Sequence, residues 1–287
     1  MSIHRESAPV IRNVGVVTLA ALYDATLLAE PNDLAVGISI EEIKGCSPDV
    51  VTGDGRWALD VTCYLIQSRG KSILIDTGVG CRALDGMPRG QLDFGLASIG
   101  VDPGSIDTVV LTHLHVDHVG WCTCEDDSGN VRPFFTNAKY AVHHREWTLA
   151  TSQKELGKPW NRHLTTTVLP VEQVGQLELV EPGDEITDEV SLIELPGHTP
   201  GHLAIRISSR GEEATIIGDA SLYPAQLAHP DWYSVWDGDP ALASQVRTEL
   251  FDSLAEHSNC LIVAGHWPYP GIGHVVRSST GLKLRAG

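Results

Sequence analysis

Four potential metal ligands stand within six positions of this chain, directly after a short apolar segment, and no other feature constrains the fold as strongly. Residues 108–112, Thr-Val-Val-Leu-Thr, are mostly β-branched around an apolar centre, which predicts a strand. The side chains that follow include His113, His115, Asp117 and His118. Histidine rarely clusters by chance, whereas a metal site needs several imidazoles and carboxylates within bonding reach of one ion. The segment therefore predicts a strand that ends at a metal site.

The spacing of these residues favours two ions over one. Alternate residues of an extended segment point the same way, so His113 and His115 can share one ion. Asp117 and His118 then turn toward a second ion. The alternative is a surface loop with solvated histidines. However, buried His and Asp side chains need partners, and in a metal site they would have one another.

Three further candidates occur in one common setting, an apolar strand that runs into a glycine-flanked turn. They are His198, Asp219 and His266. Rigid strand ends are where folds present functional groups. Each of the three could be an ordinary turn residue by itself. Together with the first cluster, however, they supply the imidazoles and carboxylates that a two-metal cleft needs.

Apolar segments bounded by turn residues recur along the chain. Strands are predicted at residues 14–20, 58–67, 71–75, 108–112, 139–142, 191–195, 203–207, 214–217 and 260–264. Helical periodicity predicts helices at residues 91–99, 145–155 and 240–257. The turn Ser68-Arg69-Gly70 predicts a hairpin. Because no repeat or linker interrupts residues 1–287, we predict a single domain of layered α/β architecture, two packed sheets with helices outside.

The charge and composition of the chain limit the classes of molecule that it is expected to bind. A formal net charge of −17, without any Lys/Arg-rich run, argues against nucleic acid. No stretch approaches the roughly 20 apolar residues of a membrane span, and residues 1–6 lack the order of a secretory signal. We therefore expect a cytoplasmic location, no membrane partner and a small-molecule substrate. The six cysteines are scattered along a chain that can build its own core, so we expect them to be reduced.

The order of the motifs, His-x-His-x-Asp-His, then Gly-His-Thr-x-Gly-His, Gly-Asp and Gly-His, resembles the metallo-β-lactamase superfamily over residues 14–276. The resemblance implies a four-layer αββα sandwich with the site at one edge. It also implies that the first metal takes His113, His115 and His198, that the second takes Asp117, His118 and His266, and that Asp219 bridges them. Asp76, in the early Asp-x-Gly element, is expected to support the ligands.

Within the superfamily the chain is most similar to N-acyl homoserine lactonases and methyl parathion hydrolase, through residues 267–275 and Asp237-x-Asp239-Pro240. This implies a dinuclear hydrolase of a small ester or lactone, in which a metal-bridging hydroxide attacks the substrate. The ligand set favours two Zn²⁺ per chain, with Mn, Fe or Co as alternatives. Organophosphate triesters and β-lactams remain open as substrates. An iron-dependent oxidoreductase on the same scaffold is the alternative from another class.

Two side chains are candidates for a direct part in the reaction. Asp117 can accept a proton and return it to the leaving group. Tyr223 closely follows Asp219, as a tyrosine does in the lactonases, where its hydroxyl can bond a substrate oxygen. His202 is given no metal in the family pattern, and we expect it to hydrogen-bond near the site.

Two other regions can shape the cleft. Residues 23–55 form an extended N-terminal insertion that could cover the cleft as a lid or pack on a second subunit of a homodimer. Aromatic side chains without a clean period crowd the stretch before the last helix and the stretch after the last ligand, and we expect some of them to line an apolar cleft. They are Trp232, Tyr233, Trp236, Trp267 and Tyr269.

Overall fold

The structure is a computed structural model that describes residues 7–83, 87–126, 128–257, 259–279 and 281–287. Residues 1–6, on which the expectation about a secretory signal rests, lie outside the described residues. Among the described residues, none of the helices combines the length and the apolar character needed to cross a bilayer.

The first sheet has seven strands in the spatial order β1-β2-β3-β4-β5-β8-β9. These strands are β1 (Val10–Val14), β2 (Val17–Ala29), β3 (Trp57–Ser68), β4 (Lys71–Ile75), β5 (Thr108–Val110), β8 (Lys139–His143) and β9 (Leu177–Val180). Strands β1 to β4 pair antiparallel, whereas β4, β5, β8 and β9 are parallel. The carboxyl ends of the parallel strands therefore meet at one edge. A separate two-stranded sheet pairs β6 (Thr123–Glu125) with β7 (Val131–Pro133).

The second sheet also has seven strands, in the order β10-β11-β12-β13-β14-β15-β16. These strands are β10 (Glu185–Thr187), β11 (Val190–Glu194), β12 (Leu203–Ser209), β13 (Glu212–Ile216), β14 (Cys260–Val263), β15 (Ile272–Ser278) and β16 (Gly281–Ala286). Only the β13-β14 pair is parallel among these described strands. The parallel pair again brings two strand ends to a common edge.

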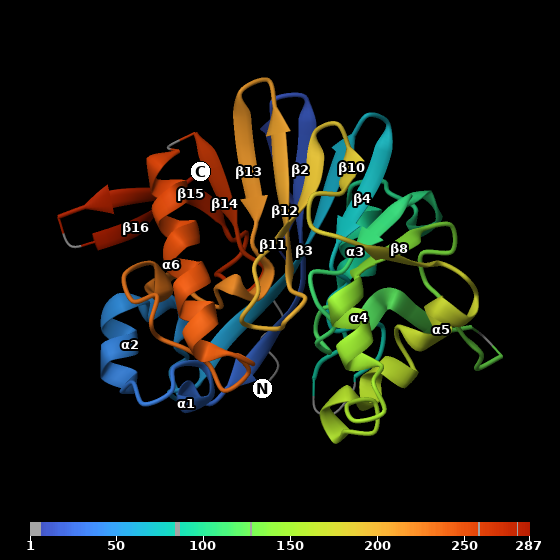
Figure 1. The fold of residues 1–287 in the computed structure, drawn as a ribbon, viewed down its shortest axis with the longest axis horizontal. Coiled ribbons are helices and arrows are strands. Elements are labelled where there is room, and N and C mark those ends of the chain that lie inside the picture. Colours follow the sequence, from blue (N-terminus) through green and yellow to red (C-terminus); the bar gives the residue numbers. More distant parts are fainter. Residues whose placement is uncertain (1–6, 84–86, 127, 258, 280) are drawn as a thin grey trace.

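Helices cover the outer faces of both sheets (Figure 1). The helices are α1 (Pro31–Leu34), α2 (Ile40–Cys46), α3 (Leu92–Ser98), α4 (His144–Ala150), α5 (Leu169–Gln173) and α6 (Pro240–Glu256). Short 3-10 helices are η1 (Pro48–Val50), η2 (Pro103–Ser105), η3 (Gly120–Cys122), η4 (Pro159–Thr165), η5 (Gly218–Ala220) and η6 (Pro224–Leu227). In Figure 1, α3, α4 and α5 lie over the first sheet and α6 lies over the second.

Three apolar clusters hold these layers together. Between the sheets, side chains such as Ile73 and Val110 pack with Ile205. The first sheet packs its outer face on α3, α4 and α5, and the second packs Ile262 against Phe251 of α6. Burial of this apolar surface is the main favourable term in folding. The predicted αββα sandwich is confirmed.

Residues 23–55, predicted as an insertion, begin as a continuation of the sheet. Strand β2 runs on to Ala29, past the predicted strand end at residue 20, and α1, α2 and η1 follow it. Leu34, Ile43 and Val50 are buried in a separate cluster with Trp57. This cluster fixes the segment against the sandwich. Its use as a lid or as a dimer surface stays a prediction.

Cysteine pairing differs from the expectation. Cys81 and Cys124 form a disulfide bridge, with their Cα atoms 6.2 Å apart. The expectation that all cysteines are reduced is therefore wrong for this pair. The two cysteines are separated by 43 residues, and the fold brings the loop after β4 beside β6. A local sequence pattern therefore could not predict the disulfide. Cys46, Cys63, Cys122 and Cys260 are free thiols.

Candidate metal centre

The strand ends that carry the candidate ligands meet at one edge of the sandwich. Strands β4 and β5 are parallel, so Asp76 and the segment 113–118 leave the first sheet side by side. Strands β13 and β14 are parallel in the second sheet, which does the same for Asp219 and His266. His198 stands in the connection between β11 and β12. Strand direction alone thus gathers residues from both halves of the chain.

The seven predicted ligands form two adjacent groups. These groups are His113, His115, His198 and Asp219 on one side, and Asp117, His118 and His266 on the other. Asp219 stands between them. Its Oδ2 lies 3.3 Å from Nε2 of His198 and 3.8 Å from Nε2 of His113. Its Oδ1 lies 3.3 Å from Nε2 of both His118 and His266. One carboxylate therefore turns one oxygen to each group.

Most of the histidines are oriented by hydrogen bonds on the side away from the cluster. The acceptors of their Nδ1 protons are Thr112 Oγ1 for His113 (3.1 Å), Asp76 Oδ2 for His118 (2.8 Å), Asp237 Oδ1 for His198 (2.9 Å) and the Asp60 carbonyl for His266 (2.9 Å). Because each Nδ1 donates, the lone pair of each Nε2 is left to face the cluster.

The residues present fit a divalent cation in each group. Nδ1 of His115 lies 3.0 Å from Nε2 of His198, and two such nitrogens attract each other only when a proton or a cation lies between them. Nε2 of His113 is buried and has no hydrogen-bond partner among the described residues. Buried polar atoms of this kind are normally partnered. Imidazole nitrogens and carboxylates are the ligands that zinc and similar metals take.

Without metal, the cluster divides into protonated and neutral rings. Burial lowers the pKa of His118, but the carboxylates of Asp219 and Asp76 outweigh burial and raise that pKa well above its usual value. Burial also lowers the pKa of His266, and Asp219 outweighs it to raise that pKa to about 9. Burial, together with the neighbouring His118 ring, lowers the pKa of His113 well below its usual value. Protons thus occupy the second group when cations do not.

Asp76 has the supporting contacts that were expected of it. Its Oδ2 accepts hydrogen bonds from Nδ1 of His118 and from the Thr112 hydroxyl, both at 2.8 Å. Its Oδ1 accepts from the Thr112 backbone N–H, also at 2.8 Å. The backbone of Asp76 has φ 57°, a left-handed conformation that costs free energy for a non-glycine residue. The hydrogen bonds hold the residue in this conformation, beside the site.

Asp219 is positioned by its neighbour Gly218 and by His202. Nε2 of His202 accepts the backbone N–H of Asp219 at 2.9 Å. Gly218 has φ 48°, and a Cβ at this position would lie 2.6 Å from the same nitrogen, so only glycine fits. Burial lowers the pKa of His202 to about 3, which keeps the ring neutral. His202 belongs to neither group of candidate ligands, as expected.

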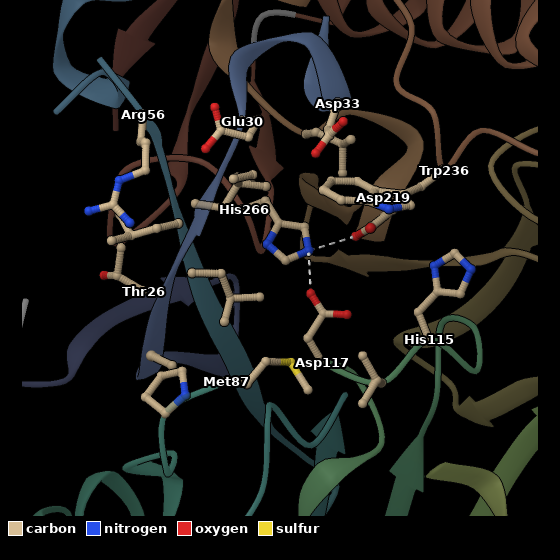
Figure 2. Close-up of a pocket in the computed structure, with 18 of the residues that line it drawn as sticks. Thr26, Glu30, Asp33, Arg56, Met87, His115, Asp117, Asp219, Trp236 and His266 are labelled. Carbon is tan, nitrogen blue, oxygen red and sulfur yellow. Dashed lines mark ion pairs between the residues drawn. The ribbon is translucent and has the colours of Figure 1, made fainter. Parts of the chain in front are cut away.

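A pocket of about 1020 Å³ opens onto the cluster. Figure 2 shows His115, Asp117, Asp219 and His266 facing it, with Trp236 and Asp33 nearby. Its apolar lining includes Leu27, Leu28, Leu59, Met87, Leu222, Val235 and Trp236. Its charged lining, apart from the candidate ligands, is Glu30, Asp33, Arg56 and Arg89. Strand β2 and the residues after it supply one wall, so the segment 23–55 does reach the cleft.

Comparison with known proteins identifies the family. Residues 56–266, most of the chain, match the metallo-beta-lactamase superfamily. The chain belongs to the metallo-β-lactamase superfamily. It is a hydrolase with the fold of that superfamily, and its His and Asp groups are candidate metal sites of the kind such hydrolases use.

Four proteins to which the chain is similar illustrate the likeness, with identities between 23% and 26% over the aligned residues. An N-acyl homoserine lactonase of Bacillus sp is 25% identical over 79% of this chain and 85% of its own length. The hydroxyacylglutathione hydrolase GloC of Haemophilus influenzae is 26% identical over 63% of this chain and 78% of its own length. Among solved structures, the hydrolase AbOPH superposes with a TM-score of 0.85 at 26% identity, over 98% of both chains. The dizinc quorum-quenching lactonase AidC has the same fold, with a TM-score of 0.81 at 23% identity and 98% of both chains covered.

Tyr223 does not lie at the candidate metal centre. The side chain is buried in the apolar cluster beside Trp57, and its hydroxyl donates to the Leu34 carbonyl at 3.2 Å. Tyr223 is also absent from the pocket lining. In this arrangement the Tyr223 hydroxyl is hydrogen-bonded to the segment 23–55.

Of the aromatic side chains considered for the cleft, Trp236 lines the pocket. Trp267 is buried and donates from Nε1 to the Ser221 hydroxyl at 3.2 Å. Trp232 stacks on His229 with ring centres 4.2 Å apart. The remaining two, Tyr233 and Tyr269, are not among the lining residues. Of the five aromatic residues that were expected to supply lining for the cleft, Trp236 alone is among the lining residues of the pocket.

Sequence reasoning missed two buried residues that support the centre. Asp237 accepts the Nδ1 proton of His198, and Arg247 of α6 lies 3.5 Å from the other oxygen of Asp237. Arg247 also donates to the carbonyls of Ala220 (2.7 Å) and Trp232 (2.8 Å), so it ties α6 to the loop after Asp219. In the sequence, the Asp237-x-Asp239-Pro240 motif was used only as evidence of the family. The carboxylate of Asp237 in that motif was the signal that could have predicted a partner for a ligand histidine.

Proposed function

We propose that this chain is a dinuclear metal-dependent hydrolase of a small, neutral ester or lactone, similar to an acyl homoserine lactone. The observation that carries the proposal is the position of Asp219, with one oxygen toward each group of candidate ligands at the floor of a pocket. A carboxylate so placed suits a bridge between two cations.

The first cation would be held by His113, His115 and His198, and the second by Asp117, His118 and His266, with Asp219 shared. Their imidazole and carboxylate atoms favour zinc, with Mn, Fe or Co as alternatives. When bound, such a pair of cations lowers the pKa of a shared water and polarises the oxygen of a bound substrate.

The chain's own residues supply positioning and proton transfer. Asp117 lies between the cluster and the pocket, with Oδ2 3.4 Å from Nε2 of His266. Its carboxylate can accept a proton from the attacking water and pass it to the leaving oxygen. Asp76 and Asp237 keep His118 and His198 in the tautomer that faces the cluster.

The pocket favours neutral substrates with an apolar part. Leu27, Leu59 and Trp236 offer an apolar wall, on which an acyl chain can lose its contact with water. Glu30 and Asp33 line the same pocket and would repel an anionic substrate. Arg56 and Arg89 also line the pocket, but Arg56 pairs with Asp54 and Arg89 pairs with Asp93, so the charges of both are already partly balanced. These charges disfavour anionic β-lactams and glutathione thioesters, whereas a lactone or a neutral phosphotriester meets no such repulsion.

The experiment is an assay of the zinc-loaded chain against acyl homoserine lactones, aryl esters, methyl parathion and a chromogenic β-lactam, with bound metal counted by elemental analysis. We expect at least two metal ions and lactone or ester turnover. His115→Ala should abolish turnover, and the matched control His257→Ala, an exposed histidine at the end of α6, should not. Turnover of methyl parathion alone would move the proposal to phosphotriesters. Iron with dioxygen consumption, or hydrolysis of none of these compounds, would overturn it.

A further inference from the structure

A second collection of metal-ligating side chains lies at another place on the same sheet edge. Strand β8 ends at His143, α4 begins at His144, and β9 ends at Val180. His143 pairs in register with Val180 on the parallel strand, so Glu181 emerges beside both histidines. Figure 1 shows β8 and α4 on the side of the molecule away from α6. None of these residues belongs to the seven candidate ligands.

The orientation of His143 is the observation that points to a cation. Its ring is 1% exposed, and Nδ1 lies 3.1 Å from the Gly201 carbonyl, which can only accept, so Nδ1 carries the proton. Nε2 lies 3.3 Å from Oε2 of Glu181. In a neutral ring with its proton on Nδ1, Nε2 and the carboxylate are both acceptors, so the contact needs a positive charge between them, either a proton on Nε2 or a bound cation.

His144 completes the arrangement. Its Nδ1 lies 2.6 Å from Oε1 of Glu181, and the three ligand atoms of this group lie within 4.8 Å of one another. Two ligands bound tetrahedrally to zinc at its usual bond lengths stand roughly 3.3 Å apart, which matches the separation between His143 and Glu181. The separation between His144 and Glu181 is shorter than this, so the exposed His144 ring would move outward to bind the same ion. His144 and Glu181 are 49% and 57% exposed, so water can reach the remaining coordination positions. Arg145, next along the chain, pairs with Glu194 and does not compete for Glu181.

We propose that His143, His144 and Glu181 form a separate binding site for a divalent first-row cation, with Zn²⁺ as the best match to two imidazoles and one carboxylate. The site is connected to the main centre through Gly201, which accepts from His143 and donates from its N–H to Glu146 (3.2 Å). Gly201 lies in the β11–β12 connection that also carries His198. A bound ion would hold His143 in the tautomer that anchors this connection.

The test is a count of zinc ions on the chain. The metal-free chain is titrated with Zn²⁺ in competition with a chromogenic chelator, for the wild type, His144→Ala and Glu181→Gln. We expect both variants to bind one ion fewer than the wild type. Both positions are exposed, so thermal unfolding measured in chelator should show that the variants fold as the wild type does.

Two controls keep this site separate from the main centre. His257→Ala, which removes an exposed histidine elsewhere, should bind as many ions as the wild type. His115→Ala weakens the main centre and should still lose a further ion when His144→Ala is added. Because the readout is the difference of one ion, it does not depend on the proposed hydrolase activity. Equal ion counts in the wild type, His144→Ala and Glu181→Gln would overturn the proposal and leave a proton as the charge between His143 and Glu181.

Discussion

Asp237 is the side chain whose loss tests most directly how the candidate ligands are oriented. It is buried, accepts the Nδ1 proton of His198 and lies 3.5 Å from the guanidinium of Arg247. An outer carboxylate of this kind fixes the histidine tautomer and raises the basicity of the ligand. Asp239 is two positions away and has a different task, because its side chain caps α6 by accepting from the backbone N–H of Leu242.

These two aspartates make a matched pair for mutation. Asp237→Asn keeps an acceptor for His198 but loses the negative charge, and we expect zinc affinity to fall by roughly 10-fold to 100-fold. Asp239→Ala should leave zinc affinity unchanged and lower the free energy of unfolding by about 1 kcal/mol, because it removes a helix cap. Zinc affinity is measured by chelator competition and stability by urea unfolding. Equal zinc affinities for Asp237→Asn and the wild type would show that His198 is oriented without this carboxylate.

Strand β2 is joined to its surroundings by the buried carboxylate of Asp24. Oδ1 accepts from the backbone of Gln91 and Leu92 at the start of α3 and from Nε1 of Trp121, each at 2.9 Å. Oδ2 accepts from the backbone of Val79 at 2.7 Å. Burial raises the pKa of Asp24 to about 6, although these hydrogen bonds lower it. One side chain therefore links β2, α3 and the loop after β4.

The raised pKa of Asp24 predicts a pH-dependent stability. Below pH 3.8 the carboxyl is protonated in both the folded and the unfolded chain. Above that, the unfolded chain ionises first, so the stabilisation of the folded chain is lost as pH rises through about 6. Asp24→Asn cannot ionise. With metal removed by a chelator, the free energy of unfolding of the wild type, compared with that of Asp24→Asn, should therefore rise by about 2 kcal/mol when the pH is lowered from 7 to 4.5. Urea unfolding measures this difference, and a constant gap between the two proteins would contradict the raised pKa.

The sequence predicted the elements whose local signals agree with the fold. The hairpin at residues 68–70 forms as expected, because Arg69 and Gly70 both take positive φ, 52° and 76°, as a tight hairpin turn requires. The helix predicted at residues 145–155 ends instead at Ala150. Thr151 donates from its hydroxyl to the Trp147 carbonyl at 2.6 Å, a local hydrogen bond that competes with helix continuation. Hydrophobic periodicity carries no information about such a bond.

At the candidate site, the ligands themselves could be predicted from the sequence more readily than the groups that hold the ligands in position. The seven candidate ligands were visible because histidine rarely clusters by chance and because His and Asp recur after apolar strands, and the structure brings all seven together. The buried position of Tyr223 could not be predicted, because spacing along the chain does not tell whether a side chain turns to the cleft or to the core. The Asp60 carbonyl, which accepts from His266, left no trace in the sequence, since any residue type supplies a carbonyl.

Across the whole molecule, the candidate centre joins the two sheets. His113, His118 and Asp117 follow a strand of the first sheet, whereas Asp219 and His266 follow strands of the second. Cations shared by these residues would therefore connect the two halves of the sandwich and offset part of the net charge of −17. Metal that binds only the folded chain stabilises it by mass action. Chelation should lower the stability of the entire fold, beyond that of the loops around the site.

The size of this chelation effect should depend on pH. In the metal-free chain, the pKa of His266 is raised from 6.5 to about 9, so its protonated ring stabilises the fold fully below pH 6.5 and this stabilisation is lost as pH rises through 9. The unfolding free energy of the chelated chain should then fall by up to about 3 kcal/mol over this range. In the zinc-loaded chain His266 is already deprotonated, because metal ligation requires the neutral ring.

Urea unfolding of both forms at pH 6.5, 8 and 9 should therefore show a gap that widens with pH. The chelated variant His266→Gln supplies the control, because it has no ring to protonate and should lose less stability over the same range. If the loaded and chelated curves of the wild type run parallel, Asp219 does not hold a proton on His266. The interaction between the two sheets at this edge would then have to come from packing alone.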